Sequence, residues 1–313
     1  MASRLRAWLK VFVAAAILAL LFDRIPFSQV VADLVSVAPG PLVVAVLCTL
    51  TAQVLVAYRL TRLAALQGMD VSLVEALDVN LSSNFFGLFL PGGNVSRMAV
   101  RSYKLAQPGG SGVASVATVV FDRLTATVAL GLFGQAFWLL DRPADSWTVG
   151  LLLLVTWAVP GVVTALGRLP PGTEAPGSGG GAFRRRLDSA RQAARQFAGM
   201  SPGTAVNVLS VSLAAQAIST AVYVLLAEGL GIDIGWISLA WIASATAVLS
   251  MLPVTPSGIG VREGTLVFLL GRAGVPGSEA VALSLSFFAC TVVLVGLIGG
   301  AVEGRRWMRR AEA

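Results

Sequence analysis

Several ionisable side chains interrupt apolar stretches of this sequence: Arg97, Arg101, Asp122, Arg123, Arg262 and Glu263. Charged groups at membrane depth are costly, so they usually face a cavity or pair with one another. Arginine offers a planar fork of N–H donors that fits a phosphate. These side chains therefore predict a phosphate-binding cavity inside a membrane, in which the two acids orient the guanidinium groups. A purely structural role stays open for each neighbouring acid–arginine pair, which can also pin helices together.

Two breaks rich in proline and glycine come before these arginines. Leu90-Pro-Gly-Gly-Asn94 precedes Arg97, and the segment Leu252–Gly260 precedes Arg262. Glycine adopts turns that other residues resist, and a helix that begins after such a turn points free N–H groups and a positive end toward an anion. The predicted substrate-binding residues are Gly92, Gly93, Asn94, Arg97, Arg101, Asp122, Arg123, Gly258, Gly260, Arg262 and Glu263.

The composition places these residues in a membrane protein. Of the 313 residues, 56% are hydrophobic and 12% are charged, whereas a soluble domain carries roughly 25% charged residues. The mean hydropathy is +0.80. These values exclude an ordinary soluble enzyme and a disordered chain. The apolar runs lack strict alternation, so the spans are expected to be helices and not barrel strands.

Residue usage also limits the chemistry. The sequence contains no histidine, which removes histidine-dependent triads and the usual zinc ligand sets. Cys48 and Cys290 both lie in apolar runs and are expected to be small buried hydrophobes. Neither a cofactor nor a metal site is predicted. Only Asp122 and Glu263 remain as candidates for a general base.

The apolar runs predict six crossings, at about 8–22, 42–63, 113–140, 147–166, 204–230 and 279–303. The first run is interpreted as an uncleaved helix and not as a signal peptide. Residues 167–203 form an extramembranous loop, with a glycine-rich linker and an amphipathic helix over 183–200 that rests on anionic headgroups. The net charge of +7 gathers at the ends of the apolar runs. This distribution favours cytoplasmic termini in the inner (cytoplasmic) membrane and argues against nucleic acid binding.

Two stretches, 71–107 and 235–275, each contain two short apolar arms around a break. Arms of this length cover about half of a bilayer, which predicts two re-entrant helical hairpins. Counting crossings places the hairpins on opposite faces, so repeat 1 (about 42–140) and repeat 2 (about 204–303) form an inverted-topology repeat, as in many transporters. The predicted fold is therefore an all-α polytopic membrane protein, with residues 1–313 in a single membrane domain.

The segment Leu252-Pro-Val-Thr-Pro-Ser-Gly-Ile-Gly-Val-Arg-Glu-Gly264 resembles the lysylphosphatidylglycerol synthase transmembrane-region family of flippase-like membrane proteins. Leu90-Pro-Gly-Gly, Arg101 and Asp122-Arg-Leu124 extend the resemblance over roughly residues 8–305. It implies a protein that handles lipids or lipid-linked sugars, without the soluble aminoacyltransferase domain of the synthases. Family members commonly carry an acid shortly before the arginine of the first motif, which this sequence lacks. The excess positive charge then favours a more anionic headgroup.

Three functions fit these observations. The leading hypothesis is a lipid translocase that binds an anionic phospholipid or lipid-linked headgroup between the two hairpins. A membrane-embedded transferase, or its accessory protein, acting on a polyprenyl-phosphate or glycolipid is the alternative. A scaffold without transport is the third, but it leaves the charged, glycine-broken hairpins unexplained. The expected partner is the lipid itself, and homo-oligomerisation stays open.

Overall fold

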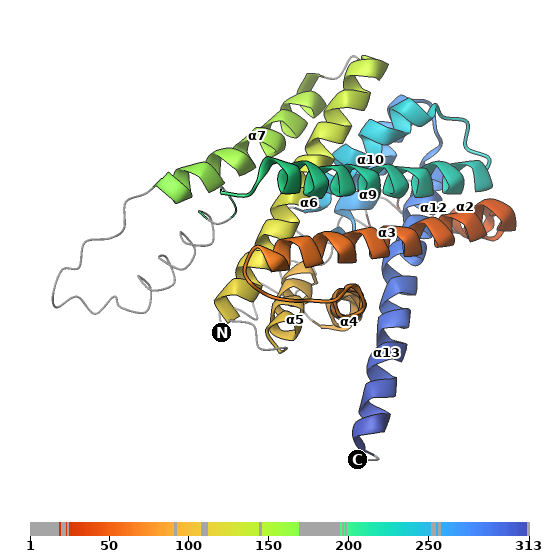
Figure 1. Cartoon of the computed structure of the whole chain (residues 1–313). Helices are drawn as coiled ribbons and strands as arrows, with labels where there is room; N and C mark the ends of the chain where they lie inside the picture. Colours follow the sequence, from red (N-terminus) through yellow and green to blue (C-terminus); the bar gives the residue numbers. More distant parts are fainter. Residues whose placement is uncertain are drawn as a thin grey trace, which may run out of the picture.

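The structure is a computed structural model that describes residues 19, 23, 25–90, 93–107, 112–143, 146–168, 195, 197, 199–251, 255 and 258–311. Its described elements are all helical (Figure 1). Four of them are long and apolar enough to cross a membrane: α3 (Pro39–Ala65), α6 (Gly112–Asp141), α9 (Pro202–Gly229) and the composite helix Gly277–Met308. The protein is thus an all-helical, multi-pass membrane protein, as the sequence predicts.

The other two predicted crossings are less completely described. The crossing at 147–166 forms α7 (Ser146–Arg168), in which the apolar part is Trp147–Ala158. The crossing at 8–22 lies outside the described residues, apart from Ala19. Most of the predicted loop helix 183–200 also lies outside them, but Phe197 is described and stacks on Phe121 of α6, with ring centroids 3.5 Å apart.

Two helix–break–helix units occupy the stretches that the sequence assigns to hairpins. The first unit is α4 (Leu73–Phe89) with α5 (Asn94–Ala106), and the second is α10 (Trp236–Ser250) with α11 (Val261–Arg272). At 1.5 Å per residue these helices are about 18–26 Å long, less than the roughly 30 Å of a hydrocarbon core. The helices are therefore too short for a full crossing, but they are longer than the half-bilayer arms that the sequence predicts.

Glycines with left-handed backbone angles begin the second helix of each unit. The N-cap of α5 is Gly93, with φ of 52°, and the N-cap of α11 is Gly260, with φ of 85°. Gly258 also has a positive φ, of 76°. The expected role of these three glycines as turn formers is confirmed, because side chains with a Cβ rarely adopt such angles. Gly92 lies outside the described residues.

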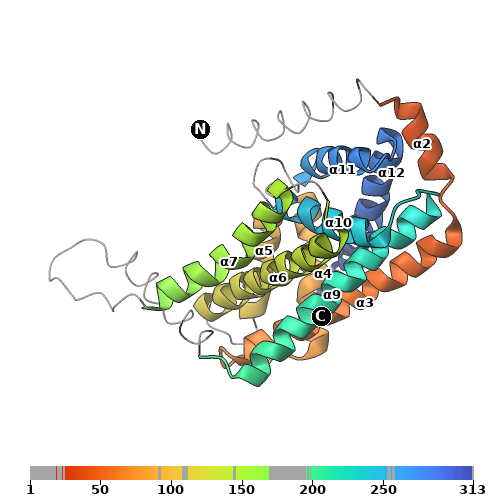
Figure 2. The same ribbon diagram turned by 90° about the horizontal axis from the view of Figure 1, so that it is seen from above.

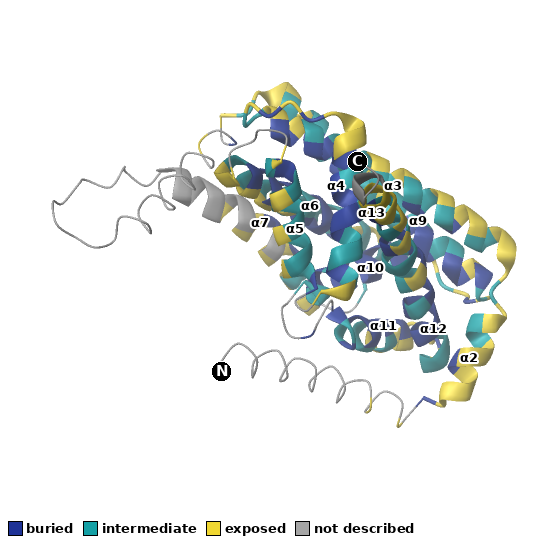
Figure 3. Ribbon diagram, turned by 90° about the horizontal axis from the view of Figure 1, so that it is seen from below, coloured by how far each residue is buried: buried dark blue, intermediate teal, exposed yellow. Residues whose placement is uncertain are grey.

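The helix α10 lies at the centre of the molecule. Each residue from Leu239 to Thr246 is buried, so every face of this helix is covered (Figure 3). A helix that is apolar all round is buried either by lipid or by protein, and here other parts of the protein cover it. Around it, α3 and α9 run side by side (Figure 2), and α2 (Phe27–Val35) packs on α12 (Gly277–Phe288). Cys290 is a free thiol buried in this central core, as expected, whereas the free thiol Cys48 packs against the core but is only half-buried.

The last helix approaches α4 closely through glycines. After α12 the chain forms a π-helical turn, η2 (Ala289–Val293), and continues as α13 (Leu294–Ala311). A Cβ on Gly299 would collide with the backbone carbonyl of Leu81, and a Cβ on Gly300 would lie 2.8 Å from the ring of Phe85. The glycines therefore permit a helix contact that larger residues block.

We expect Gly299→Ala to lower the thermal unfolding midpoint by several degrees, because the new methyl group would push α13 away from α4. The matched control is Gly304→Ala in the same helix, where nothing lies within 4 Å of an added Cβ. There the better helix propensity of alanine predicts an unchanged or slightly higher midpoint. Unfolding in detergent, followed by tryptophan fluorescence, measures both variants. Equal midpoints would contradict the close packing of the two helices.

Candidate functional site

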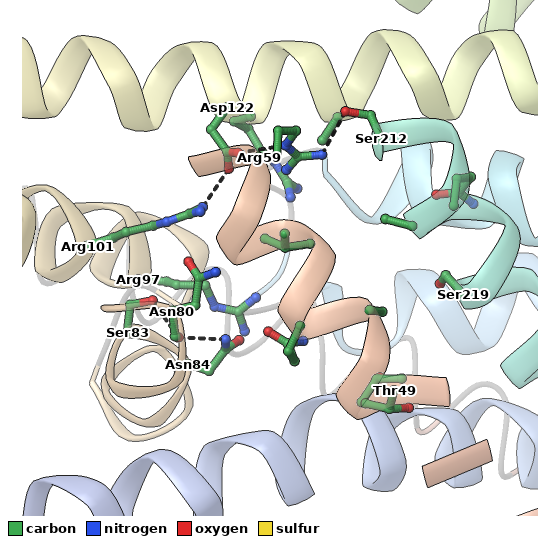
Figure 4. Close-up of a pocket in the computed structure, with 18 of the residues that line it drawn as sticks. Thr49, Arg59, Asn80, Ser83, Asn84, Arg97, Arg101, Asp122, Ser212 and Ser219 are labelled. Carbon is green, nitrogen blue, oxygen red and sulfur yellow. Dashed lines mark hydrogen bonds and ion pairs between the residues drawn. The ribbon is translucent and has the colours of Figure 1, made fainter. Parts of the chain in front are cut away.

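A cavity of about 290 Å³ opens among α3, α4, α5, α6, α9 and the junction of α12 with η2 (Figure 4). Much of its lining is polar. The charged lining residues are Arg59, Arg97, Arg101, Asp122 and Arg123, and the neutral polar ones are Thr49, Gln53, Asn80, Ser83, Asn84, Ser212, Gln216, Ser219 and Thr291. Four of the predicted site residues are therefore brought together around one cavity: Arg97, Arg101, Asp122 and Arg123.

Asp122 holds two of the arginines. Its Oδ1 accepts a hydrogen bond from Nε of Arg59 at 2.7 Å, and its Oδ2 accepts one from Nη1 of Arg101 at 2.7 Å. Nη1 of Arg59 also donates to Oγ of Ser212 at 3.1 Å. Asp122 and Arg59 are 1% and 4% exposed, so buried ion pairs connect α3, α5 and α6, and the hydrogen bond to Ser212 adds α9. The acid both positions the two arginines and joins the helices.

The remaining two arginines form no such ion pair with the described residues. The side chains of Arg97 and Arg123 make no ion pair or hydrogen bond with any part of the chain that the structure describes. Nε of Arg97 is buried, as are Nε and Nη2 of Arg101, and none of these atoms has a partner there. With four arginines and one aspartate, the lining residues that the structure describes carry three positive charges in excess. Such a site favours an anion with several acceptor oxygens.

Gly87 of α4 makes room for the side chain of Arg97. A Cβ at position 87 would lie 2.9 Å from Cβ and 3.0 Å from Nε of Arg97. Contacts this short require one of the groups to move. The glycine thus allows the arginine to pass α4 on its way to the cavity.

The second sequence motif lies apart from this cavity. Arg262 and Glu263 are not among the lining residues, and they form a cluster of their own. Nη2 of Arg262 donates to Oε1 of Glu263 at 2.5 Å, and Nε of Arg262 donates to Oγ of Ser284 at 2.8 Å. The guanidinium also lies over the ring of Phe288, 4.7 Å from its centroid. The charge of this arginine is therefore satisfied within the protein.

The helix N-termini that follow the two breaks also differ in whether the chain places an acid beside them. In the second unit, Oε2 of Glu263 accepts a hydrogen bond from the backbone N–H of Gly260 at 2.6 Å, so the chain supplies its own anion. Counted from the N-cap glycine, Ser96 takes the place of Glu263 in the first unit. Gly93 and Asn94 begin α5 but are not lining residues of the cavity. The first unit thus carries an arginine near its break without a neighbouring acid.

Arg59 is a site residue that the sequence reasoning missed. In the sequence, Arg59 and Arg62 close the predicted crossing at 42–63, and such a basic end favours the cytoplasm, whereas the structure buries Arg59 and leaves Arg62 exposed. A signal was nevertheless present. Asp122 is the only acid between positions 113 and 140, and a buried carboxylate needs a cationic partner from another helix.

Comparison with known proteins assigns the chain to a family. No curated protein matches it. The sequence pattern of the family described as the lysylphosphatidylglycerol synthase TM region matches residues 7–299, and so covers the cavity and both helix–break–helix units. Because this match extends over nearly the whole sequence, the protein belongs to the lysylphosphatidylglycerol synthase TM region family.

Proposed function

We propose that the protein binds the anionic headgroup of a membrane lipid in the arginine-lined cavity and moves that lipid across the bilayer. The observation that carries this proposal is that Arg97 and Arg123 form no ion pair among the described residues and lie beside buried N–H groups without partners. A phosphate oxygen would satisfy these donors. The membership of a lipid-related family supports a lipid, and not a soluble anion, as the source of the phosphate.

The proposal includes a topology. The two helix–break–helix units would be re-entrant hairpins that enter from opposite faces, and the repeats that contain them would be inverted, with both termini in the cytoplasm. The short helices and the matching N-cap glycines, Gly93 and Gly260, support this arrangement. The basic ends of the chain and of the loop 167–203 favour the same orientation in the inner membrane.

The geometry favours binding over acid–base chemistry. A transferase would need a carboxylate that is free to accept a proton from its substrate. Both carboxylate oxygens of Asp122 accept hydrogen bonds from arginine. Both oxygens of Glu263 are also engaged, by Arg262 and by Gly260. These two candidate bases therefore act as positioning groups for cations.

Transport of a fluorescent phosphatidylglycerol in reconstituted vesicles tests the proposal. We expect Arg97→Gln and Arg123→Gln each to lower the translocation rate at least about tenfold, because a lost charge-assisted hydrogen bond costs about 1.5–3 kcal/mol. Gly87→Ala should act in the same direction by displacing Arg97. The matched control is Arg62→Gln, which removes an exposed arginine outside the cavity. Parental rates for both cavity variants, at equal amounts of folded protein, would overturn the proposal.

A further inference from the structure

We infer that the cavity recognises a phosphate monoester, a headgroup that ends in a doubly charged phosphate, in preference to a phosphodiester. This inference rests on the proposed function and narrows the class of substrate. It depends on three features of the cavity: its excess charge, the number of its unpartnered donors, and the engagement of its only carboxylate.

The excess charge exceeds what one phosphodiester neutralises. Among the described residues, Arg59 and Arg101 form ion pairs with Asp122, whereas Arg97 and Arg123 form none, and Asp122 acts on Arg123 only at longer range. A diester such as phosphatidylglycerol brings one negative charge, which leaves two of the three excess positive charges uncompensated. A terminal phosphate brings close to two at neutral pH. The monoester therefore compensates a low-dielectric, cationic site more completely.

The unpartnered donors match the oxygens of a terminal phosphate. Nε of Arg97, Nε and Nη2 of Arg101 and Nδ2 of Asn80 are buried and lack a partner within the described residues. Asn80 is itself 3% exposed, on α4, and the two arginines face it from α5 (Figure 4). A terminal phosphate presents three strong acceptor oxygens, whereas a diester presents two that are not esterified. The monoester thus satisfies more of these donors.

The described lining of the cavity offers no free carboxylate to an amine. Among these residues Asp122 is the only acid, and both of its oxygens already accept from arginine. An ammonium group on a headgroup would enter a positive field without a counter-ion. Headgroups that carry an amine are therefore disfavoured, and the preference should run from phosphate monoester to phosphodiester to amine-bearing diester.

Competition binding at two pH values tests this order. The full chain in detergent is loaded with a fluorescent phosphatidylglycerol, which is displaced by dioctanoyl phosphatidic acid, phosphatidylglycerol or phosphatidylethanolamine. At pH 8 we expect phosphatidic acid to bind about tenfold more tightly than phosphatidylglycerol, and phosphatidylethanolamine to bind most weakly. At pH 5 the advantage of phosphatidic acid should fall to within about twofold, because the second pKa of a phosphate monoester is about 6.

Variants and a soluble competitor separate the alternatives. Arg123→Gln should reduce the preference for phosphatidic acid at pH 8, and the exposed control Arg62→Gln should keep it. Equal affinities for phosphatidic acid and phosphatidylglycerol at pH 8 would overturn the inference and leave the proposed function standing. Glycerol 3-phosphate that competes as well as phosphatidic acid would identify a soluble phosphate as the ligand and overturn both. Lipid affinities that respond to neither Arg97→Gln nor Arg123→Gln would also overturn both.

Discussion

Replacing Asp122 with asparagine is expected to lower the free energy of unfolding by about 3–5 kcal/mol, the cost of breaking a buried ion pair by removing one partner. The physical reason is local. In the part of the lining that the structure describes, Asp122 is the only acid beside four arginines, and Arg59 and Arg101 both form ion pairs with it. Asparagine keeps the size of the side chain and one acceptor oxygen, but the cavity then carries four uncompensated charges.

The matched control is Asp141→Asn in the same helix. Asp141 also has both oxygens engaged, but its partners are neutral: Oγ of Ser238 at 2.9 Å and Nε1 of Trp241 at 2.7 Å. Its loss is expected to cost less, about 1–3 kcal/mol. Chemical denaturation in detergent measures both variants. An anionic lipid should stabilise the Asp122 variant more than the parent, because its cavity has gained an unpaired charge. Equal losses for the two variants would show that charge at position 122 is not what joins the helices.

Hydropathy is sufficient to place the long helices of this protein. The run predicted at 42–63 forms a helix over Pro39–Ala65, and the run at 113–140 forms one over Gly112–Asp141. The sequence also predicts the positions of the two breaks, where Gly93 and Gly260 adopt left-handed backbone angles. Apolar length and glycine chemistry are local properties, and local properties are what a single sequence records best.

The pairing of the charges is not local, and the sequence predicts it only in part. Asp122 and Arg101 line one cavity, and Arg59 comes from a helix that only the packed fold brings beside them. The π-helical turn at Ala289–Val293 carries the lining residue Thr291. It contains no proline or glycine from which the sequence could predict it. Periodicity tells which face of a helix a residue occupies, but not which helix covers that face.

Arg262 illustrates the opposite case, because its partner is adjacent in the sequence. The spacing of three residues from Gly260 to Glu263 is that of a helix N-cap and its N3 acid, and the structure shows Glu263 capping α11 while it binds Arg262. The pair was expected on the wall of the cavity, with a structural role as the alternative. Arg262 and Glu263 both form hydrogen bonds with Ser284 as well as with each other, which favours the structural role.

Glu263→Ala separates these two roles of the second motif. The variant leaves Arg262 buried without its acid and exposes the N–H of Gly260, so we expect a loss of about 3–5 kcal/mol in the free energy of unfolding. Replacing both members of the pair, as in Arg262→Met with Glu263→Met, should recover part of this loss, because no unpaired charge then remains.

Lipid binding by the same variants gives the decisive comparison. Because Arg262 and Glu263 lie outside the lining of the cavity, the folded fraction of Glu263→Ala should bind phosphatidylglycerol with an affinity within about twofold of the parent. Arg97→Gln should show the reverse pattern, a weaker affinity with little change in the free energy of unfolding. Among the described residues Arg97 forms no ion pair, so its replacement leaves no buried acid unpaired. If Glu263→Ala instead abolishes binding at equal folded protein, the second unit contributes directly to the headgroup site. The charged residues of both breaks would then act on one substrate.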